Sequence, residues 1–205
     1  MRGKLKHGIL GLAALAVLAT ASSAEAADSK KVFAVRGIGL ETCKAFVASM
    51  KDVQAQAVAA GWIMGYLTAA NRVNPDTFDL SPIGALNPTP LLRFLVGACA
   101  KQPDQGVERV FSEIVQFLAI ARNHAGSPIV QTKSGKNAAE VRAETLIAMQ
   151  TKLIELGVFK GKADGVYGPK LEASLKAFQK DQKLPETGVA DAGTVVRLLI
   201  ELKKK

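Results

Sequence analysis

Apolar residues recur at steps of three and four along most of the chain, which is the spacing of one face of a helix. The first half holds four such stretches. Their apolar faces are Cys43, Phe46, Val47 and Met50; Val58, Trp62 and Tyr66; Leu91, Leu92, Leu95 and Cys99; and Val107, Val110, Phe111, Ile114, Phe117 and Leu118. Thr89-Pro90 is typical of a helix start. The pattern therefore predicts a four-helix N-terminal domain.

The C-terminal part predicts three shorter helices. Their apolar faces are Leu146, Met149, Leu153 and Leu156; Leu171, Leu175 and Phe178; and Val195, Leu198, Leu199 and Leu202. Gly157 supplies a stop for the first helix. The second should end before Pro185, because a residue ahead of proline is disfavoured in helical geometry. Asp191 is expected to cap the third. The whole chain is thus predicted to be all-α, with Phe178 in the core.

Composition divides the chain further. The start has basic residues (Arg2, Lys4, Lys6), an apolar run from Ile9 to Leu18, and the small-residue site Ala24-Glu25-Ala26, which together are typical of a secretory signal peptide. The apolar run is too short to span the hydrocarbon core of a membrane as a stable anchor. A polar stretch with glycine, proline and serine favours a flexible linker. The expected segments are a signal peptide (1–26), a helical domain (27–123), a linker (124–138) and a C-terminal domain (139–205).

Export also bears on the two cysteines, Cys43 and Cys99. In an oxidising compartment they are most simply a disulfide that joins the first and third helices. A catalytic thiol is the alternative, and it would need a histidine. After removal of the signal peptide the chain has only His124, which lies in the expected linker.

Three stretches of the C-terminal part carry a family resemblance. They read Leu-Gly-Val-Phe-Lys-Gly-Lys-Ala-Asp-Gly-Val-Tyr-Gly-Pro, Lys-Ala-Phe-Gln and Thr-Gly-Val-Ala-Asp-Ala-Gly-Thr, and they resemble the peptidoglycan-binding domain family. The positions that keep the family order are Gln150, Leu153, Leu156, Gly157, Gly161, Asp164, Gly165, Gly168, Phe178, Gln179, Leu184, Thr187, Gly188, Asp191, Thr194 and Leu198. The resemblance implies a three-helix domain that binds peptidoglycan.

The candidate peptidoglycan-binding residues follow from this resemblance and from the preference of binding groups for loops. They are Lys162, Asp164, Gly165, Tyr167, Gly168 and Gln179. The turn 161–168 and the segment 176–179 are expected to border a shallow groove. Leu171 stands where the family usually has threonine. The missing hydroxyl should weaken the start of the second helix a little.

The N-terminal domain has a slighter resemblance over residues 37–122. Cys43, the segment Trp62 to Tyr66 and the segment Cys99 to Pro103 resemble HdeA-like periplasmic acid-stress chaperones and immunity proteins of type VI secretion amidases. This resemblance implies a disulfide-linked helical fold for the domain, and it gives a periplasmic acid-stress chaperone or an immunity protein anchored to the wall as an alternative function.

Charge and the scarcity of catalytic residues narrow the function. The net charge of +9 becomes +7 when three basic residues and Glu25 leave with the signal peptide. A basic exported protein is attracted to the anionic envelope, whereas scattered lysines and few aromatic residues argue against nucleic acid. One histidine cannot supply a catalytic zinc site. A muramidase needs only two carboxylates, and the available ones are Glu41, Asp52, Asp76, Asp79, Glu108 and Glu113.

No motif singles out a pair of these carboxylates. The sequence therefore predicts a periplasmic, non-enzymatic protein with no metal and no cofactor. It is expected to bind peptidoglycan through its C-terminal domain, to present the helical domain to a protein partner, and to have no membrane contact after signal cleavage. A cell-wall hydrolase with carboxylate catalysis remains the enzymatic alternative.

Overall fold

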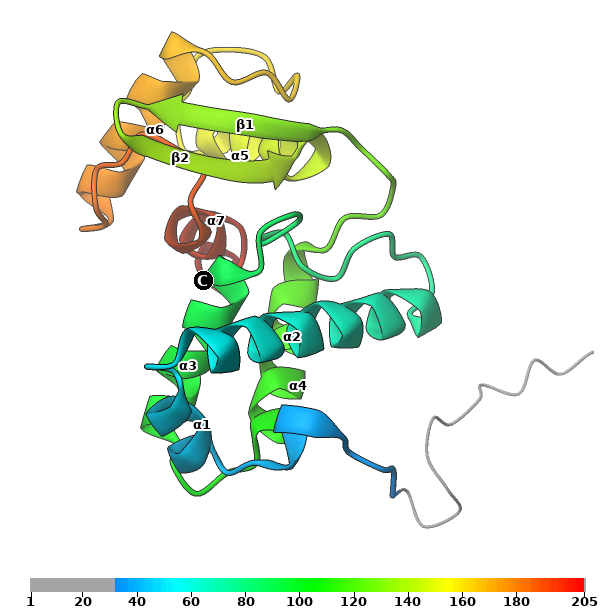
Figure 1. Cartoon of the computed structure of the whole chain (residues 1–205). Coiled ribbons are helices and arrows are strands. Elements are labelled where there is room, and N and C mark those ends of the chain that lie inside the picture. Colours follow the sequence, from blue (N-terminus) through cyan, green and yellow to red (C-terminus); the bar gives the residue numbers. More distant parts are fainter. Residues whose placement is uncertain (1–31, 205) are drawn as a thin grey trace, which may run out of the picture. The chain divides into compact units, whose positions relative to one another are not determined.

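The computed structural model describes residues 32–204 and divides the chain into two units, Met1–Ala34 and Val35–Lys205. The predicted signal peptide lies outside the described residues. Of the first unit, residues 32–34 are described and have no regular secondary structure. The elements of the second unit (Figure 1) are η1 (Gly37–Leu40), α1 (Cys43–Ser49), α2 (Val53–Val73), α3 (Thr89–Lys101), α4 (Val107–Leu118), η2 (Ala119–Ala121), β1 (Ile129–Ser134), β2 (Asn137–Arg142), α5 (Ala143–Glu155), α6 (Pro169–Asp181), α7 (Ala192–Leu199) and η3 (Glu201–Lys204).

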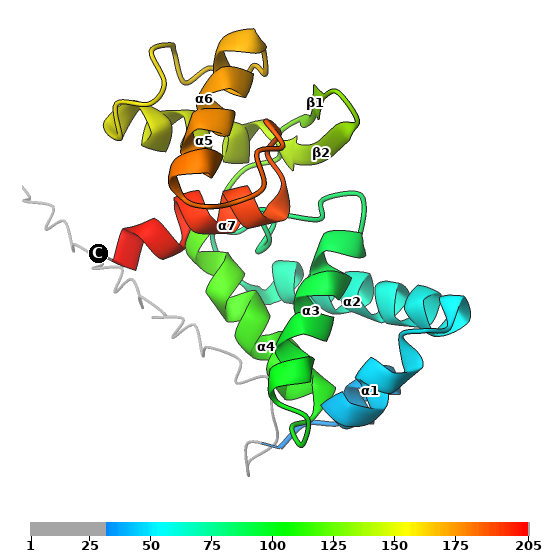
Figure 2. The ribbon, with the colours of Figure 1, turned by 90° about the vertical axis from the view of Figure 1, so that its left-hand side faces the viewer.

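The four predicted N-terminal helices are present, and α3 packs against α1, α2 and α4 (Figure 2). Their apolar faces meet in one core, in which Phe46, Ile63, Leu95 and Phe111 are fully buried. Val58 is the exception among the predicted core positions, with 61% of its surface exposed. Helix formation here therefore follows the apolar spacing, and the burial supplies the stability that short isolated helices lack.

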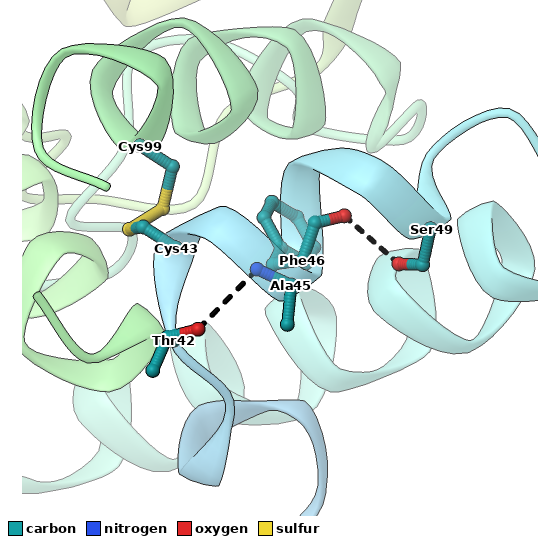
Figure 3. The surroundings of a disulfide bond; sticks show 6 residues. All are labelled: Thr42, Cys43, Ala45, Phe46, Ser49 and Cys99. Atoms are coloured by element: carbon teal, nitrogen blue, oxygen red, sulfur yellow. Dashed lines mark hydrogen bonds between the residues drawn. A yellow bond between two sulfur atoms is a disulfide. The ribbon is translucent and has the colours of Figure 1, made fainter. Parts of the chain in front are cut away.

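Cys43 and Cys99 form the predicted disulfide, which joins the first turn of α1 to the last turns of α3 (Figure 3). Both cysteines are fully buried. The hydroxyl of Thr42 caps α1 by accepting a hydrogen bond from the Ala45 amide at 3.3 Å. A cross-link that closes a loop of 56 residues stabilises the fold by about 4 kcal/mol in the chain-entropy account.

Residues 129–138 of the expected flexible linker lie in a β-hairpin, and the all-α prediction is confirmed for the described chain apart from this small sheet. Residues 129–134 form β1, which pairs antiparallel with β2, and Gly135 has φ +55° in the two-residue turn between them. Val130, Thr132 and Ser134 lie on the same face of β1; Thr132 and Ser134 are buried, and Val130 is partly buried against the core. Because two of these three positions are polar, the strand has no regular apolar alternation to reveal it. The described chain is thus mostly helical with one small two-stranded sheet.

The three predicted C-terminal helices are present, and the hairpin packs on the first of them, α5. Gly157 adopts φ +73° just beyond α5, as expected of a helix stop. The Asp191 side chain caps α7 by accepting a hydrogen bond from the Thr194 amide at 2.9 Å. Phe178 is buried in the core as predicted, whereas Leu156 is 45% exposed because it lies past the end of the helix.

Polar contacts connect the N-terminal helical part (residues 35–123, called the helical part below) to the hairpin and α5. Arg142 on β2 donates to the Asp79 carboxylate at 3.1 Å and lies over the Phe78 ring, 4.7 Å from its centroid. The Thr145 hydroxyl donates to the Asn123 side chain at 2.9 Å. Within residues 32–204, no helix is both long enough and apolar enough to cross a membrane.

Candidate functional site

Two turns, one at Gly165 before α6 and one at Gly188 before α7, are each held by a buried glutamine. The glutamine on α5 holds the first. The Gln150 side chain is fully buried, and its carbonyl oxygen accepts a hydrogen bond from the Gly165 amide at 2.8 Å. Its amide nitrogen donates to Asp164 Oδ1 and to the Val166 carbonyl, both at 3.0 Å. Gly165 has φ +73°, a conformation that favours glycine. One side chain therefore fixes the backbone on both sides of the turn before α6.

A second buried glutamine, on α6, does the same for the turn before α7. Gln179 accepts a hydrogen bond from the Gly188 amide at 2.8 Å and donates to the Val189 carbonyl at 3.1 Å. Its amide nitrogen also lies 2.8 Å from Thr187 Oγ1 and 2.9 Å from Thr194 Oγ1. Gly188 has φ +71°. The two turns are therefore built alike, each four residues ahead of a helix.

The two helix starts differ in their caps. Asp191 Oδ1 accepts hydrogen bonds from both the amide and the hydroxyl of Thr194 at the start of α7. At the start of α6 the corresponding positions are Gly168, which provides no side-chain cap, and Leu171, which is buried. The α6 start therefore lacks a capping hydroxyl, as the sequence predicted, and has an apolar core contact in its place.

Tyr167 connects the two turns. Its hydroxyl donates to the Gly188 carbonyl at 2.8 Å. Partial burial, and secondarily the negative charge of Glu172, raises the pKa of Tyr167 to about 12. The phenol therefore stays protonated and keeps donating throughout the neutral pH range. Without its proton, the Tyr167 oxygen could no longer donate a hydrogen bond to the Gly188 carbonyl.

Lys162 and Asp164 lie at the exposed tip of the first turn. Hydrogen bonds from the Val166 amide and the Gln150 side chain, with a smaller contribution from the Lys162 charge, hold the pKa of Asp164 below its usual range. The tip therefore presents a carboxylate and an ammonium group to solvent at neutral pH.

Glu172 joins α6 to the hairpin beside Tyr167. It accepts hydrogen bonds from Lys176 Nζ at 2.7 Å and from Ser134 Oγ at 2.6 Å, and these two contacts lower its pKa. A Cβ at Gly188 would meet Lys176 at 2.6 Å and Glu172 at 3.1 Å. Position 188 therefore favours glycine mainly for its positive φ, and a larger residue would also displace the Lys176 side chain.

The six candidate binding residues have different environments. Lys162 and Asp164 are exposed, Tyr167 and Gly168 are partly buried, and Gly165 is buried within its turn. Gln179 has no exposed surface. The structure does not bring Gln179 to the surface with the others, and its side chain shapes the second turn.

Several residues that the candidate set left out matter as much to this geometry. They are Gln150, Thr187, Asp191 and Thr194, and Ser134 and Glu172 beside them. A signal for the pairing was present in the sequence, since Gly165-Val166 and Gly188-Val189 each precede a helix start by the same number of residues. No group of three or more His, Cys, Asp or Glu side chains within the described residues is placed to hold a metal ion.

Comparison with known proteins assigns the class of this C-terminal part. Residues 142–198, which include α5, α6, both glutamine-held turns and nearly all of α7, match the family model described as putative peptidoglycan binding domain. The C-terminal part of the chain is therefore a domain of this family, as the sequence resemblance predicted.

Among curated proteins, the localization factor PodJL of Caulobacter vibrioides is 42% identical over 72 residues, which cover 35% of this chain and 7% of that protein. The carboxy-terminal processing protease CtpA of Bacillus subtilis is 34% identical over 61 residues, covering 30% of this chain and 13% of the protease. The putative OxPP cycle protein OpcA of Nostoc punctiforme is 44% identical over 55 residues, which cover 27% of this chain and 12% of that protein.

The similarity thus spans only a small part of each relative. No solved structure matches the chain.

Proposed function

We propose that this protein is an exported, non-enzymatic component of the cell envelope that binds peptidoglycan through its C-terminal domain. The domain match at residues 142–198 is the observation that carries this proposal. The helical part, closed by the Cys43–Cys99 disulfide, is then held at the wall and is available to a protein partner. A disulfide of this kind suits an oxidising compartment outside the cytoplasm.

The exposed tip of the first turn is the proposed contact surface. Asp164 and Lys162 offer charged hydrogen-bonding groups that are complementary to the amides, amines and carboxylates of the polymer. The Gln150 contacts restrain Asp164 before the ligand arrives, so little conformational entropy is lost on binding.

Co-sedimentation with purified cell-wall sacculi tests the proposal, using the full chain from residue 27 to 205. Fragments that begin within the hairpin are unsuitable, because Thr132 on β1 accepts a hydrogen bond from the Ala190 amide and is part of the domain. We expect the wild-type chain to sediment with sacculi, and binding to persist near 1 M salt, where the screening length falls to about 3 Å.

Asp164→Ala should weaken sedimentation, and Asp104→Ala is the matched control because it removes the same charge from an exposed turn in the helical part. Equal binding by both variants would rule out the proposed tip. Complete loss of wild-type binding at moderate salt would show that the interaction is only nonspecific charge attraction. Incubation should release no soluble muropeptides, and release that depends on one carboxylate would establish the hydrolase alternative.

A further inference from the structure

A cleft of about 590 Å³ lies within the unit Val35–Lys205 and does not include the exposed tip of the first turn. One wall comes from α3 and the loop before it, including Ile83, Arg93 and Phe94. The other comes from the hairpin, including Gln131 and Glu140, and from the residues that lead into α7. The cleft is therefore formed jointly by the helical part and the family domain.

The two walls have side chains of opposite charge. Arg93 on α3 is exposed, and no other residue of the described chain forms a hydrogen bond or an ion pair with its guanidinium. On the hairpin, Glu140 Oε1 accepts a hydrogen bond from Gln131 at 2.6 Å, while Glu140 Oε2 is buried and has no hydrogen-bond partner. Oε2 has almost no access to solvent, so a ligand reaches it only when the Glu140 side chain turns within the cleft that it lines. A donor that then pairs with this oxygen recovers the free energy that the missing hydrogen bond costs.

Asp191 also lines the cleft, but its carboxylate is already engaged. Its Oδ1 accepts from Thr194, and its Oδ2 accepts from Thr187. Glu140 is consequently the acidic group with unused hydrogen-bonding capacity. The remaining lining includes Phe94 and the small side chains of Ala138 and Ala139, which suit methyl-sized apolar groups.

We propose that this cleft binds a short peptide that carries both a free carboxylate and a free ammonium group. The carboxylate pairs with Arg93, the ammonium with Glu140, and small apolar side chains lie against the alanines. Within peptidoglycan, this chemistry belongs to an uncrosslinked peptide stem with a diamino acid and terminal alanines, not to the sugar chain. The inference rests on the proposed function and adds a second contact with the polymer, separate from the exposed tip of the first turn.

Calorimetric titration of the full chain (27–205) tests this with two synthetic peptides. The first is Ala-γGlu-Lys-Ala-Ala, acetylated at its N-terminus so that the lysine carries the only amine. The second is identical except that the lysine amine is also acetylated. We expect the first peptide to bind the wild type more tightly, because charge-assisted hydrogen bonds are the strong ones. Arg93→Ala should weaken binding of both peptides roughly 10-fold or more.

Glu140→Gln should weaken binding of the first peptide roughly 10-fold and leave the second unchanged. Arg109→Ala is the matched control, because it removes an exposed arginine from α4, outside the cleft, and should change neither affinity. Circular dichroism of each variant confirms folding. Equal weakening by Arg93→Ala and Arg109→Ala, or equal loss of both peptides in Glu140→Gln, would refute the cleft assignment.

Sacculi separate this inference from the proposed function. If the wild type sediments with sacculi but binds neither peptide, the cleft assignment fails and the proposed function stands. Undiminished sedimentation with glycan strands stripped of their peptides would also refute the stem as the ligand. If sacculi are not bound at all, the proposed function itself fails.

Discussion

Replacement of Gln179 by alanine is expected to destabilise the C-terminal domain strongly, although the side chain has no exposed surface with which to bind a ligand. The change removes the acceptor of the Gly188 amide and the donor to the Val189 carbonyl, and both of these contacts are buried. A buried polar group left without a partner costs about 1–3 kcal/mol, so the two together cost roughly 2–6 kcal/mol.

Thr187 and Thr194 add to this estimate only weakly. Their hydroxyls also contact the Gln179 amide nitrogen, but both have Asp191 as a second partner. We therefore expect a loss of about 4 kcal/mol in the free energy of unfolding, measured by urea denaturation. The Gly188 amide should also lose its protection from hydrogen exchange.

Gln116→Ala is the matched control, because Gln116 is exposed on α4 and forms one long side-chain contact of 3.4 Å with Ser112. This variant should stay within about 0.5 kcal/mol of the wild type. The reasoning would be refuted if Gln179→Ala cost less than about 1 kcal/mol. Sedimentation with sacculi should fall only in proportion to the unfolded fraction, because Gln179 acts through the fold.

Two other predictions concern alkaline pH and the disulfide. The pKa of Tyr167 is about 12 in the folded protein against about 10 in the unfolded chain, so its contribution to stability is complete below pH 10 and is lost as the pH rises toward 12. Two pKa units correspond to at most about 2.7 kcal/mol, and solvent screening of this partly exposed ring reduces that to roughly 1 kcal/mol. In urea denaturation measured across pH, Tyr167→Phe should lack this part of the loss of stability at alkaline pH. Identical pH profiles for the wild type and the variant would contradict the assignment. Reduction of Cys43–Cys99 should lower the free energy of unfolding by about 4 kcal/mol. A Cys43→Ala/Cys99→Ala variant with wild-type stability would show that the cross-link is dispensable.

The helices could be predicted from sequence because burial follows the helical period in them. The Leu146, Met149 and Leu153 stripe and the Leu171, Leu175 and Phe178 stripe are both buried as expected. The hairpin was missed because the two buried side chains of β1, Thr132 and Ser134, are polar, and their partners lie 58 and 38 residues away. Such distant hydrogen bonds leave no local pattern.

The candidate site was only partly predictable for a related reason. Loop position and residue type predicted that Lys162 and Asp164 are accessible to a ligand, and both are exposed at the tip. The same family pattern included Gln179, whose role is set by burial against a turn nine residues further along the chain. A shared position in a family motif does not distinguish a residue that contacts the ligand from one that holds the backbone.

The paired glutamines have a further consequence for how much the domain can vary. Gln150 reaches its glycine amide across 15 residues, whereas Gln179 does so across nine, and both turns nevertheless lead into a helix in the same way. Closing the longer loop costs only about 0.5 kcal/mol more by the logarithmic dependence on length. The exposed stretch 160–162, just beyond the buried Phe159, should therefore accept insertions without loss of the helix that follows. It offers a place where new recognition sequences can be grafted onto this scaffold.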